Sequence, residues 1–265
     1  MNKKILNRIL IEWNDSDIED NGIIKASDVK DRFKYQLVYK LYNQTYLTIF
    51  YPEWPLFNEY KDKVYINGEH IKLNSYGITS DFPYSFGECN VYIEDWDKIT
   101  DFTNIFWDCH ELISVTIPSS ISIINRNAFY NCKKLKKVTI PSSVKKIDEY
   151  AFQYCYSLES ITIPSSVKKI GRSAFLDCYK LKEVIIEPGQ ESLKLIDINA
   201  FANCEKLKSI VIPNSVKWIC DGAFYNCMKL KTVYVENITN FNTIKFGDQT
   251  ANPTCYGAKL IELKK

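Results

Sequence analysis

The middle of the chain repeats one short phrase, and this repetition constrains the fold more than any other feature. Six cysteines mark the period, at separations of 23, 23, 23, 26 and 23 residues: Cys109, Cys132, Cys155, Cys178, Cys204 and Cys227. An Ala-Phe pair precedes each of the last five at a fixed distance, as Ala128-Phe129 precedes Cys132. A fixed period in this range indicates a solenoid, in which each copy buries its apolar face against its neighbours.

Each copy contains a leucine, two further residues and an apolar-x-apolar triplet, as in Leu135, Val138 and Ile140. Alternating β-branched residues predict a short strand with one face inward. A proline follows in four copies and ends the strand, because it lacks the N–H that a sheet ladder needs. Stacked copies should form a parallel sheet, with Ala, Phe and Cys in the opposite wall. Serines that recur after the strand, such as Ser143, are expected to satisfy backbone groups of the turn.

The repeated phrase, LxxVTIPSSVKKIxxxAFxxCxxL, resembles the BspA-like type of leucine-rich repeat over about half of the chain. The resemblance implies a leucine-rich-repeat solenoid of the α/β repeat class, dominated by β-structure, with a parallel sheet on its concave face. Short helical or 3-10 turns are implied for the convex face, and an N-terminal mixed region for the cap. It also implies a binding role, with no catalytic residues to carry over, and adhesion or recognition at bacterial or protozoan surfaces.

The chain order predicts three parts: an acidic, aromatic-rich N-terminal capping region (1–90), the repeats (91–236) and a C-terminal cap (237–265). Lys63–Leu73 is typical of a β-hairpin, because Asn-Gly at its centre accepts positive φ angles. Val91–Ile93 is interpreted as the strand of a degenerate first copy. The stretch 33–41 fits either a helix or a strand. Residues 187–191 replace a tight turn and should form a loop.

Nine cysteines in 265 residues raise the question of disulfides. The six periodic thiols point the same way from one wall, so neighbouring pairs lack the geometry of a bridge. We interpret them as small buried apolar side chains. Cys89, Cys220 and Cys255 lie off the period, and the sequence does not assign their redox state.

The net charge of +2 hides an asymmetry, since residues 112–235 carry 18 basic and 10 acidic side chains, whereas residues 1–111 carry 12 and 19. No run approaches the ~18 apolar residues of a membrane span. The opening residues lack the small-residue cleavage site of a secretory signal. We expect a cytoplasmic protein, or one whose leader was removed. The family resemblance suggests a cell-surface or secreted protein as the alternative.

Few residues of the chain are candidates for catalysis or metal binding. The histidines are His70 and His110, and a nucleophilic pair of Cys109 with His110 is improbable because adjacent residues need not face each other. Asp95, Asp97 and Asp101 lack the spacing of a calcium-binding loop and are interpreted as a solvated acidic surface. No Cys-x-x-Cys pair, P-loop or Gly-x-Ser-x-Gly occurs. We therefore expect no enzymatic activity, no cofactor and no metal.

The outward positions of the predicted strands form the first candidate site. They run from hydroxyl-bearing to apolar: Thr116, Thr139, Thr162, Ile185, Val211 and Tyr234. An exposed apolar patch on a rigid sheet is a plausible anchor for a partner protein. The alternative is that Ile185 and Val211 are covered by the inserted loop or by the C-terminal tail. Lys137, which flanks these positions, and Trp218 complete the predicted partner-binding residues.

Lysines that recur at fixed positions of the phrase form the second candidate. Stacking converts them into charged stripes, for example Lys145, Lys168 and Lys217, with Trp218 interrupting the neighbouring column of Lys146 and Lys169. Such stripes keep a solenoid soluble and block edge pairing, or they bind a polyanion, either nucleic acid or glycan. A third hypothesis makes the solenoid a scaffold for a small N-terminal functional unit. The sequence does not identify the partner or the oligomeric state.

Overall fold

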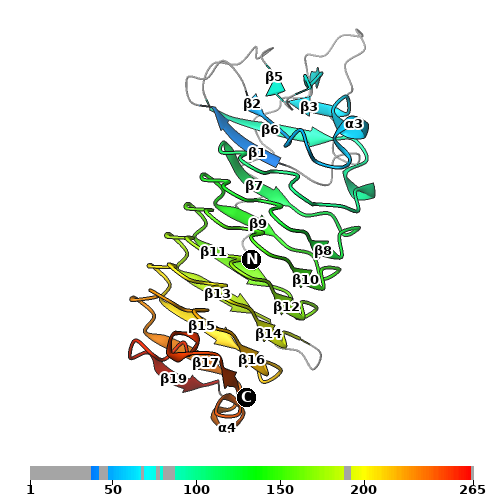
Figure 1. Ribbon diagram of the computed structural model, residues 1–265. Coiled ribbons are helices and arrows are strands. Elements are labelled where there is room, and N and C mark those ends of the chain that lie inside the picture. The colour runs from blue at the N-terminus through cyan, green and yellow to red at the C-terminus, as the bar shows by residue number, and fades with distance from the viewer. Residues whose placement is uncertain are drawn as a thin grey trace, which may run out of the picture.

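The computed structural model describes residues 37–41, 47–66, 69–75, 78–79, 87–187 and 192–263, and these wind into an elongated solenoid. Each copy of the phrase forms one coil with three sides: a strand of the main sheet, a short strand of a second sheet and a wall of turns (Figure 1). The predicted solenoid dominated by parallel β-structure is confirmed.

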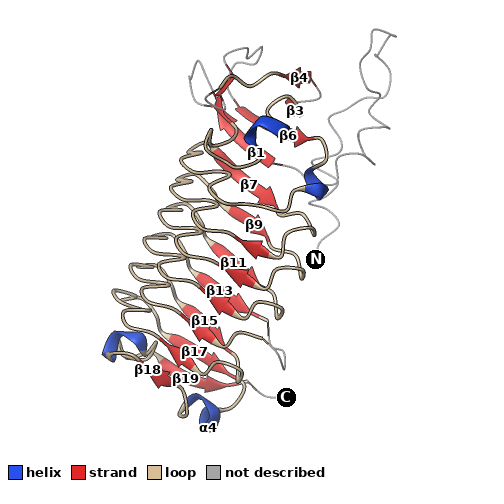
Figure 2. Cartoon of the chain, turned by 45° about the vertical axis from the view of Figure 1, so that its right-hand side comes forward, coloured by secondary structure: helices blue, strands red, loops and turns tan. Residues whose placement is uncertain are grey.

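The main sheet takes one strand from each coil, and these strands lie side by side along the solenoid (Figure 2). Its parallel registers pair equivalent residues of the phrase, for example Val115 with Val138 and Ile161 with Val184. Apolar residues at alternate positions point inward, which explains why a triplet of β-branched residues suffices for each strand. The strands are β7 (Leu112–Thr116), β9 (Lys137–Thr139), β11 (Ser160–Ile163), β13 (Glu183–Ile186), β15 (Ser209–Ile212), β17 (Thr232–Val235) and β19 (Lys259–Glu262).

The second sheet is parallel too, and it was not predicted. After the proline turn, each coil contributes a two-residue strand whose second residue is buried, such as Ile147 paired with Ile170. The strands are β8 (Ile123–Ile124), β10 (Lys146–Ile147), β12 (Lys169–Ile170), β14 (Leu195–Ile196), β16 (Trp218–Ile219) and β18 (Lys245–Phe246). The solenoid is therefore bounded by sheets on two sides.

The third side consists of turns and not of continuous helix. Its i→i+3 hydrogen bonds, such as Cys132 N–H to Phe129 O at 3.2 Å, resemble those of a 3-10 helix. Two residues of the coil adopt positive φ, as Asn127 (56°) and Asn131 (60°) do, which redirects the chain before a helix can extend. Main-chain N–H groups then bond the next coil, as Phe129 N–H does to Ala151 O at 2.8 Å.

The core between these sides is a stack of identical rings. Phe129, Phe152 and Phe175 lie parallel, with ring centroids 5.0 and 5.1 Å apart and interplanar angles of 4° and 5°. All three rings are fully buried. The serines after the strands connect coils as well, since Ser143 Oγ donates to Ile121 O at 2.7 Å and Ser166 Oγ to Val144 O at 2.6 Å. The prediction that these hydroxyls satisfy backbone groups is confirmed, but the acceptors lie in the preceding coil.

The N-terminal part continues the main sheet with antiparallel strands. β1 (Leu37–Leu41) lies between β7 and β6 (Gly87–Ile93), and β6 pairs with β3 (Val64–Ile66), which forms the predicted hairpin with β4 (Glu69–Ile71). The ambiguous stretch is thus a strand where it is described. Val91–Ile93 belongs to an antiparallel strand, so its interpretation as the strand of a degenerate repeat was wrong. The other elements are β2 (Leu47–Thr48), β5 (Ile78–Thr79), α3 (Phe57–Tyr60) and η1 (Trp96–Lys98).

This region extends the aromatic core beyond the first coil. Phe50 stacks on Phe106 at 6.0 Å, and the Tyr51 N–H donates to Ile105 O at 2.9 Å. At the other end, α4 (Ile238–Phe241) and η2 (Gln249–Ala251) separate the last strands, and β18 and β19 still pair with the preceding coil. The C-terminal residues therefore add one more coil with a different sequence.

Candidate protein-binding surface

The outward residues of the main sheet form a column, occupying equivalent positions of successive coils, although strand pairing is interrupted between β9 and β11. The register pairs Thr116 with Thr139, Thr162 with Ile185, and Val211 with Tyr234. Thr139 and Thr162 are exposed, and Ile185 retains 38% of its accessible surface. The structure thus brings together the six predicted strand residues.

The column also contains a residue that the sequence reasoning missed. Ile261 of β19 pairs with Tyr234 and is 41% exposed. As far as Leu263, the C-terminal tail therefore extends the apolar column and does not cover it. The inserted loop at 188–191, which was the other expected cover, lies outside the described residues. The apolar pair Leu260-Ile261 was the available signal, but Cys255 lies off the 23-residue spacing and no proline follows this strand in the sequence. We call Ile185, Val211, Tyr234 and Ile261 the apolar stripe.

The two remaining predicted residues lie elsewhere. Lys137 stands at the exposed start of β9, beside the column, where it pairs with Ser114. Trp218 belongs to β16 in the second sheet, so it is not part of the surface formed by the strand residues. It is 49% exposed, and Lys245 Nζ lies 5.7 Å from its ring centroid. The register confirms its predicted column with Lys146 and Lys169.

Lysines of the second sheet are largely neutralised by ion pairs. Lys146 Nζ lies 3.0 Å from Asp148, and Lys169 Nζ lies 2.7 Å from Asp197. The hydrogen bond that Lys169 donates to Asp197 raises the pKa of Lys169. Burial acts to raise the pKa of Asp197, but the bonds from Lys169 and from the Ile198 N–H outweigh it, so that pKa is lowered. Both groups are therefore charged at neutral pH.

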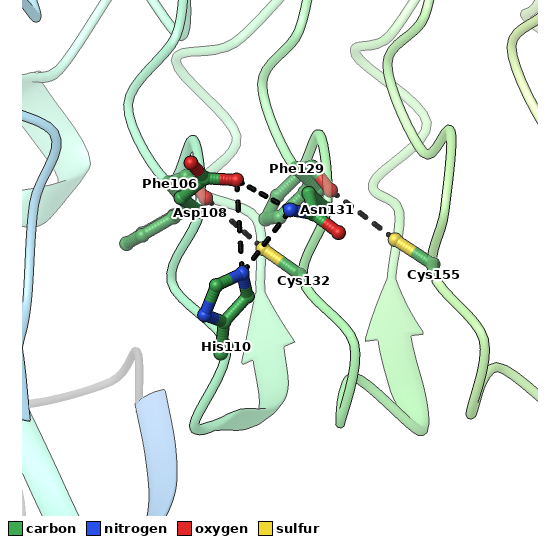
Figure 3. A network of polar contacts seen from close by, with 7 residues as sticks. All are labelled: Phe106, Asp108, His110, Phe129, Asn131, Cys132 and Cys155. Atoms are coloured by element: carbon green, nitrogen blue, oxygen red, sulfur yellow. Dashed lines mark hydrogen bonds and ion pairs between the residues drawn. The ribbon is translucent and has the colours of Figure 1, made fainter.

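The periodic cysteines are buried and are not bridged by disulfides, as predicted. Cys132 Sγ donates to Phe106 O at 3.0 Å and Cys155 Sγ to Phe129 O at 3.2 Å (Figure 3). Burial raises the pKa of the Cys132 and Cys155 thiols, which keeps them protonated. Cys220 and Cys255 are also free thiols, and both are partly exposed.

The Cys109–His110 pair does not form a nucleophile with its base. Cys109 Sγ donates to Ile49 O inside the core, whereas His110 Nε2 contacts Asn131 Nδ2 at 3.1 Å on the turn wall (Figure 3). Asp108 Oδ1 lies 3.7 Å from that imidazole nitrogen and accepts a 2.6 Å bond from Asn131. Burial and Lys133 lower the pKa of His110.

In the predicted acidic cluster, Asp95 forms ion pairs with two lysines. Asp95 lies 2.7 Å from Lys98 and 3.3 Å from Lys63, and their hydrogen bonds lower its pKa against the opposing effect of burial. Within the described ranges, His, Cys, Asp and Glu side chains form no group of three or more suited to a metal ion. No helix among the residues with described coordinates has the length and hydropathy to cross a membrane.

Each coil contributes one strand to the main sheet. Each also carries a leucine, an Ala-Phe pair and a cysteine at fixed positions. Together these features define a leucine-rich-repeat protein. The family described as the BspA type leucine rich repeat region matches residues 98–231 and 186–251, in six copies. Because these matches cover more than half of the 265 residues, the chain belongs to this family. A comparison with curated proteins finds no match.

Solved structures of bacterial leucine-rich-repeat proteins resemble parts of the chain. The T. pallidum leucine rich repeat protein is 33% identical over 55% of this chain and 64% of its own, with a TM-score of 0.48. A Bacteroides ovatus leucine-rich repeat protein is 29% identical over 58% and 45%, with a TM-score of 0.40. The pneumococcal vaccine antigen PcpA is 35% identical over 48% and 32%, with a TM-score of 0.43. The chain thus spans less than two thirds of each of these relatives.

Proposed function

We propose that this chain is a non-enzymatic recognition module that binds a partner protein through the outer face of the main sheet. The observation that carries the proposal is the apolar stripe, in which Ile185 and Ile261 are 38% and 41% exposed on a surface fixed by main-chain hydrogen bonds. Soluble proteins rarely expose contiguous apolar surface without a binding role. A rigid sheet also loses little conformational entropy when a partner docks.

The anchor of the stripe is Tyr234, whose ring stands between Val211 and Ile261 in the register. Tyrosine is enriched among residues that dominate binding energy, because it supplies a large apolar surface with few rotatable bonds. The hydroxyl-bearing N-terminal part of the same column offers hydrogen bonds instead. The partner should therefore bind most strongly over β13, β15, β17 and β19.

A capture experiment with matched variants tests the surface. Wild-type chain, the Val211→Asp/Tyr234→Ala variant and the Thr139→Asp/Thr162→Ala variant are immobilised, and proteins captured from the native cell are quantified. The second variant places the same residue types on the same face outside the stripe. We expect the stripe variant to lose a specific partner that the other retains. Equal recovery by a stripe variant with wild-type circular dichroism would rule out this surface.

We also propose a cell-surface location for the module, as the resemblance to the repeat family implies. Surface biotinylation of intact cells that express the natural gene tests this location. Labelling of the protein to the extent of a known surface protein supports it. Labelling only after lysis, like a cytoplasmic marker, contradicts it.

A further inference from the structure

The coils that begin at Leu181, Leu207 and Leu230 share a feature that lies outside the apolar stripe. In each of them a buried leucine lies between two exposed lysines, at the corner where the turn wall meets the main sheet. The leucines are 0, 0 and 2% exposed. We call the six lysines the lysine ridge: Lys180, Lys182, Lys206, Lys208, Lys229 and Lys231.

The ridge is a stacked array and not a scatter of surface charges. The Lys208 N–H donates to Lys182 O at 2.8 Å, and the Lys231 N–H donates to Lys208 O at 3.0 Å. The three coils are thus direct neighbours, with a rise of about 4.8 Å between stacked strands. The side chains of neighbouring coils therefore start from main-chain positions closer together than one Debye length, about 8 Å at physiological salt, so screening between neighbouring lysines is incomplete.

Charge compensation distinguishes the ridge from the same corner of the earlier coils and from Lys146 and Lys169 of the second sheet. In the earlier coils this corner carries cross-coil pairs, Glu111 with Lys134 and Glu159 with Lys182. The second sheet neutralises Lys146 and Lys169 with aspartates. Among the residues that the structure describes, Lys182 alone of the ridge forms an ion pair within 4.0 Å, at 2.7 Å from Glu159. Like charges stacked in register repel one another, and a bound polyanion removes that cost.

The chemistry of the ridge selects the class of polyanion. Lysine presents a point charge without the planar fork of arginine, so it suits densely spaced anionic groups more than directional recognition. Binding of single-stranded nucleic acid requires ring faces between the charges. The residues before Lys206 and Lys229 are Glu205 and Met228, and the ring of Tyr179 already stacks on Tyr156 at 5.2 Å and 15°.

We propose that the lysine ridge is a binding site for a linear sulfated polysaccharide, which lies along the solenoid axis across three coils. The ridge shares no residue with the apolar stripe, but Lys182, Lys208 and Lys231 directly precede β13, β15 and β17, so the two proposed sites are adjacent. Basic patches attract heparin-type ligands as well as nucleic acids, and the experiment below distinguishes the two.

The test measures binding of a heparin octasaccharide by the full chain in 50 mM and 150 mM NaCl. The ridge variant is Lys206→Ser/Lys208→Ser/Lys231→Ser, and the matched control is Lys145→Ser/Lys168→Ser/Lys217→Ser, which removes equal charge from the second-sheet side. We expect the ridge variant to weaken binding about tenfold or more, because each exposed ion pair contributes modestly and three are lost. The control should change it by less than about threefold.

Three outcomes would overturn the proposal. One is no binding of heparin by the wild-type chain at 50 mM NaCl, and another is equal weakening in both variants, which would mean attraction to net charge only. The third is ridge-dependent binding of an oligothymidylate of equal charge that exceeds the binding of heparin. That result would assign the ridge to nucleic acid.

Discussion

The thiol of Cys155 donates a hydrogen bond of 3.2 Å to the main-chain carbonyl of Phe129, which lies one coil away. The same bond links Cys178 to Phe152 and Cys227 to Phe201, at 3.3 and 3.2 Å. Each of these carbonyls also accepts the N–H of the residue three positions on, as Phe129 O does from the Cys132 N–H at 3.2 Å, so the thiol occupies a second acceptor site on the same oxygen. A thiol is a small side chain that packs as an apolar group and still donates a weak hydrogen bond. The cysteine ladder therefore ties the turn wall together without covalent bonds.

This arrangement predicts selective alkylation. With iodoacetamide at pH 7.5, Cys220 and Cys255 should react first because they are partly exposed. The six periodic thiols should react only after unfolding, since burial raises the pKa of the Cys155 thiol and raises that of Cys227 to about 12. Peptide mass mapping before and after addition of urea measures both groups. Native labelling of Cys155 as fast as that of Cys220 would contradict the buried ladder.

The phenylalanine stack predicts a large stability loss at its centre. Phe152 contacts rings on both sides at 5.0 and 5.1 Å and is fully buried. Phe152→Ala should lower the free energy of unfolding by about 3–5 kcal/mol, because it leaves a cavity between two coils. Tyr225→Ala, at a ring that is 55% exposed, should change it by less than about 0.5 kcal/mol. Urea unfolding followed by circular dichroism compares them, and similar midpoints would argue against the stack.

The parts of the fold that the sequence predicted are those where a side chain type recurs. Cys155 and Phe152 identify the interior because the same residues return every 23 or 26 positions, and a solenoid places each on the next. Ile185 and Tyr234 could be assigned to the outer face because strands alternate with a period of two. The candidate surface was therefore available from the sequence as far as Tyr234.

The parts of the fold that could not be predicted have weak or variable sequence patterns. The strand Lys146–Ile147 is too short to show alternation, so the second sheet could not be distinguished from a loop. Positive φ occurs at Tyr150 and Ser173 as well as at asparagines, so the residue type does not reveal these turns. The strand that carries Trp218 was not recognised for the same reason, although its column with Lys146 and Lys169 was predicted. Ile261 lies in a coil without the repeat's markers.

The left-handed turns predict a stabilising substitution. Tyr150 has φ of 59°, whereas the equivalent residues of neighbouring coils are Asn127 and Ser173, with φ of 56° and 51°. A bulky residue costs roughly 1 kcal/mol or more there, and asparagine costs less. Tyr150→Asn should raise the free energy of unfolding by about 0.5 kcal/mol, after loss of the contact between the Tyr150 ring and Arg126. Tyr150→Phe keeps both the strain and that contact, so it should not stabilise. A gain in urea midpoint from Tyr150→Phe equal to that from Tyr150→Asn would refute the role of the backbone.

The last prediction concerns pH and His110. Burial and the nearby Lys133 lower the pKa of His110 from its ordinary value of 6.5, against the opposing effect of Asp108 and Glu111. The unfolded chain therefore binds this proton more readily than the native state. The linkage relation then requires that stability fall as pH drops through about 6.5, and that the loss level off below the native pKa. The fall should be visible between pH 7.5 and pH 5, above the range in which ordinary carboxylates titrate.

His110→Gln isolates this contribution, because glutamine keeps a polar partner for Asn131 but has no proton to bind. The urea midpoint of the wild-type chain should decrease more between pH 7.5 and pH 5 than that of the variant. His70→Gln is the matched control, because the His70 imidazole is exposed and lies in the hairpin, where its Nε2 contacts Asp62 O at 2.7 Å. We expect His70→Gln to retain the wild-type pH dependence. If His110→Gln loses as much stability on acidification as the wild type, the imidazole on the turn wall is not responsible for it.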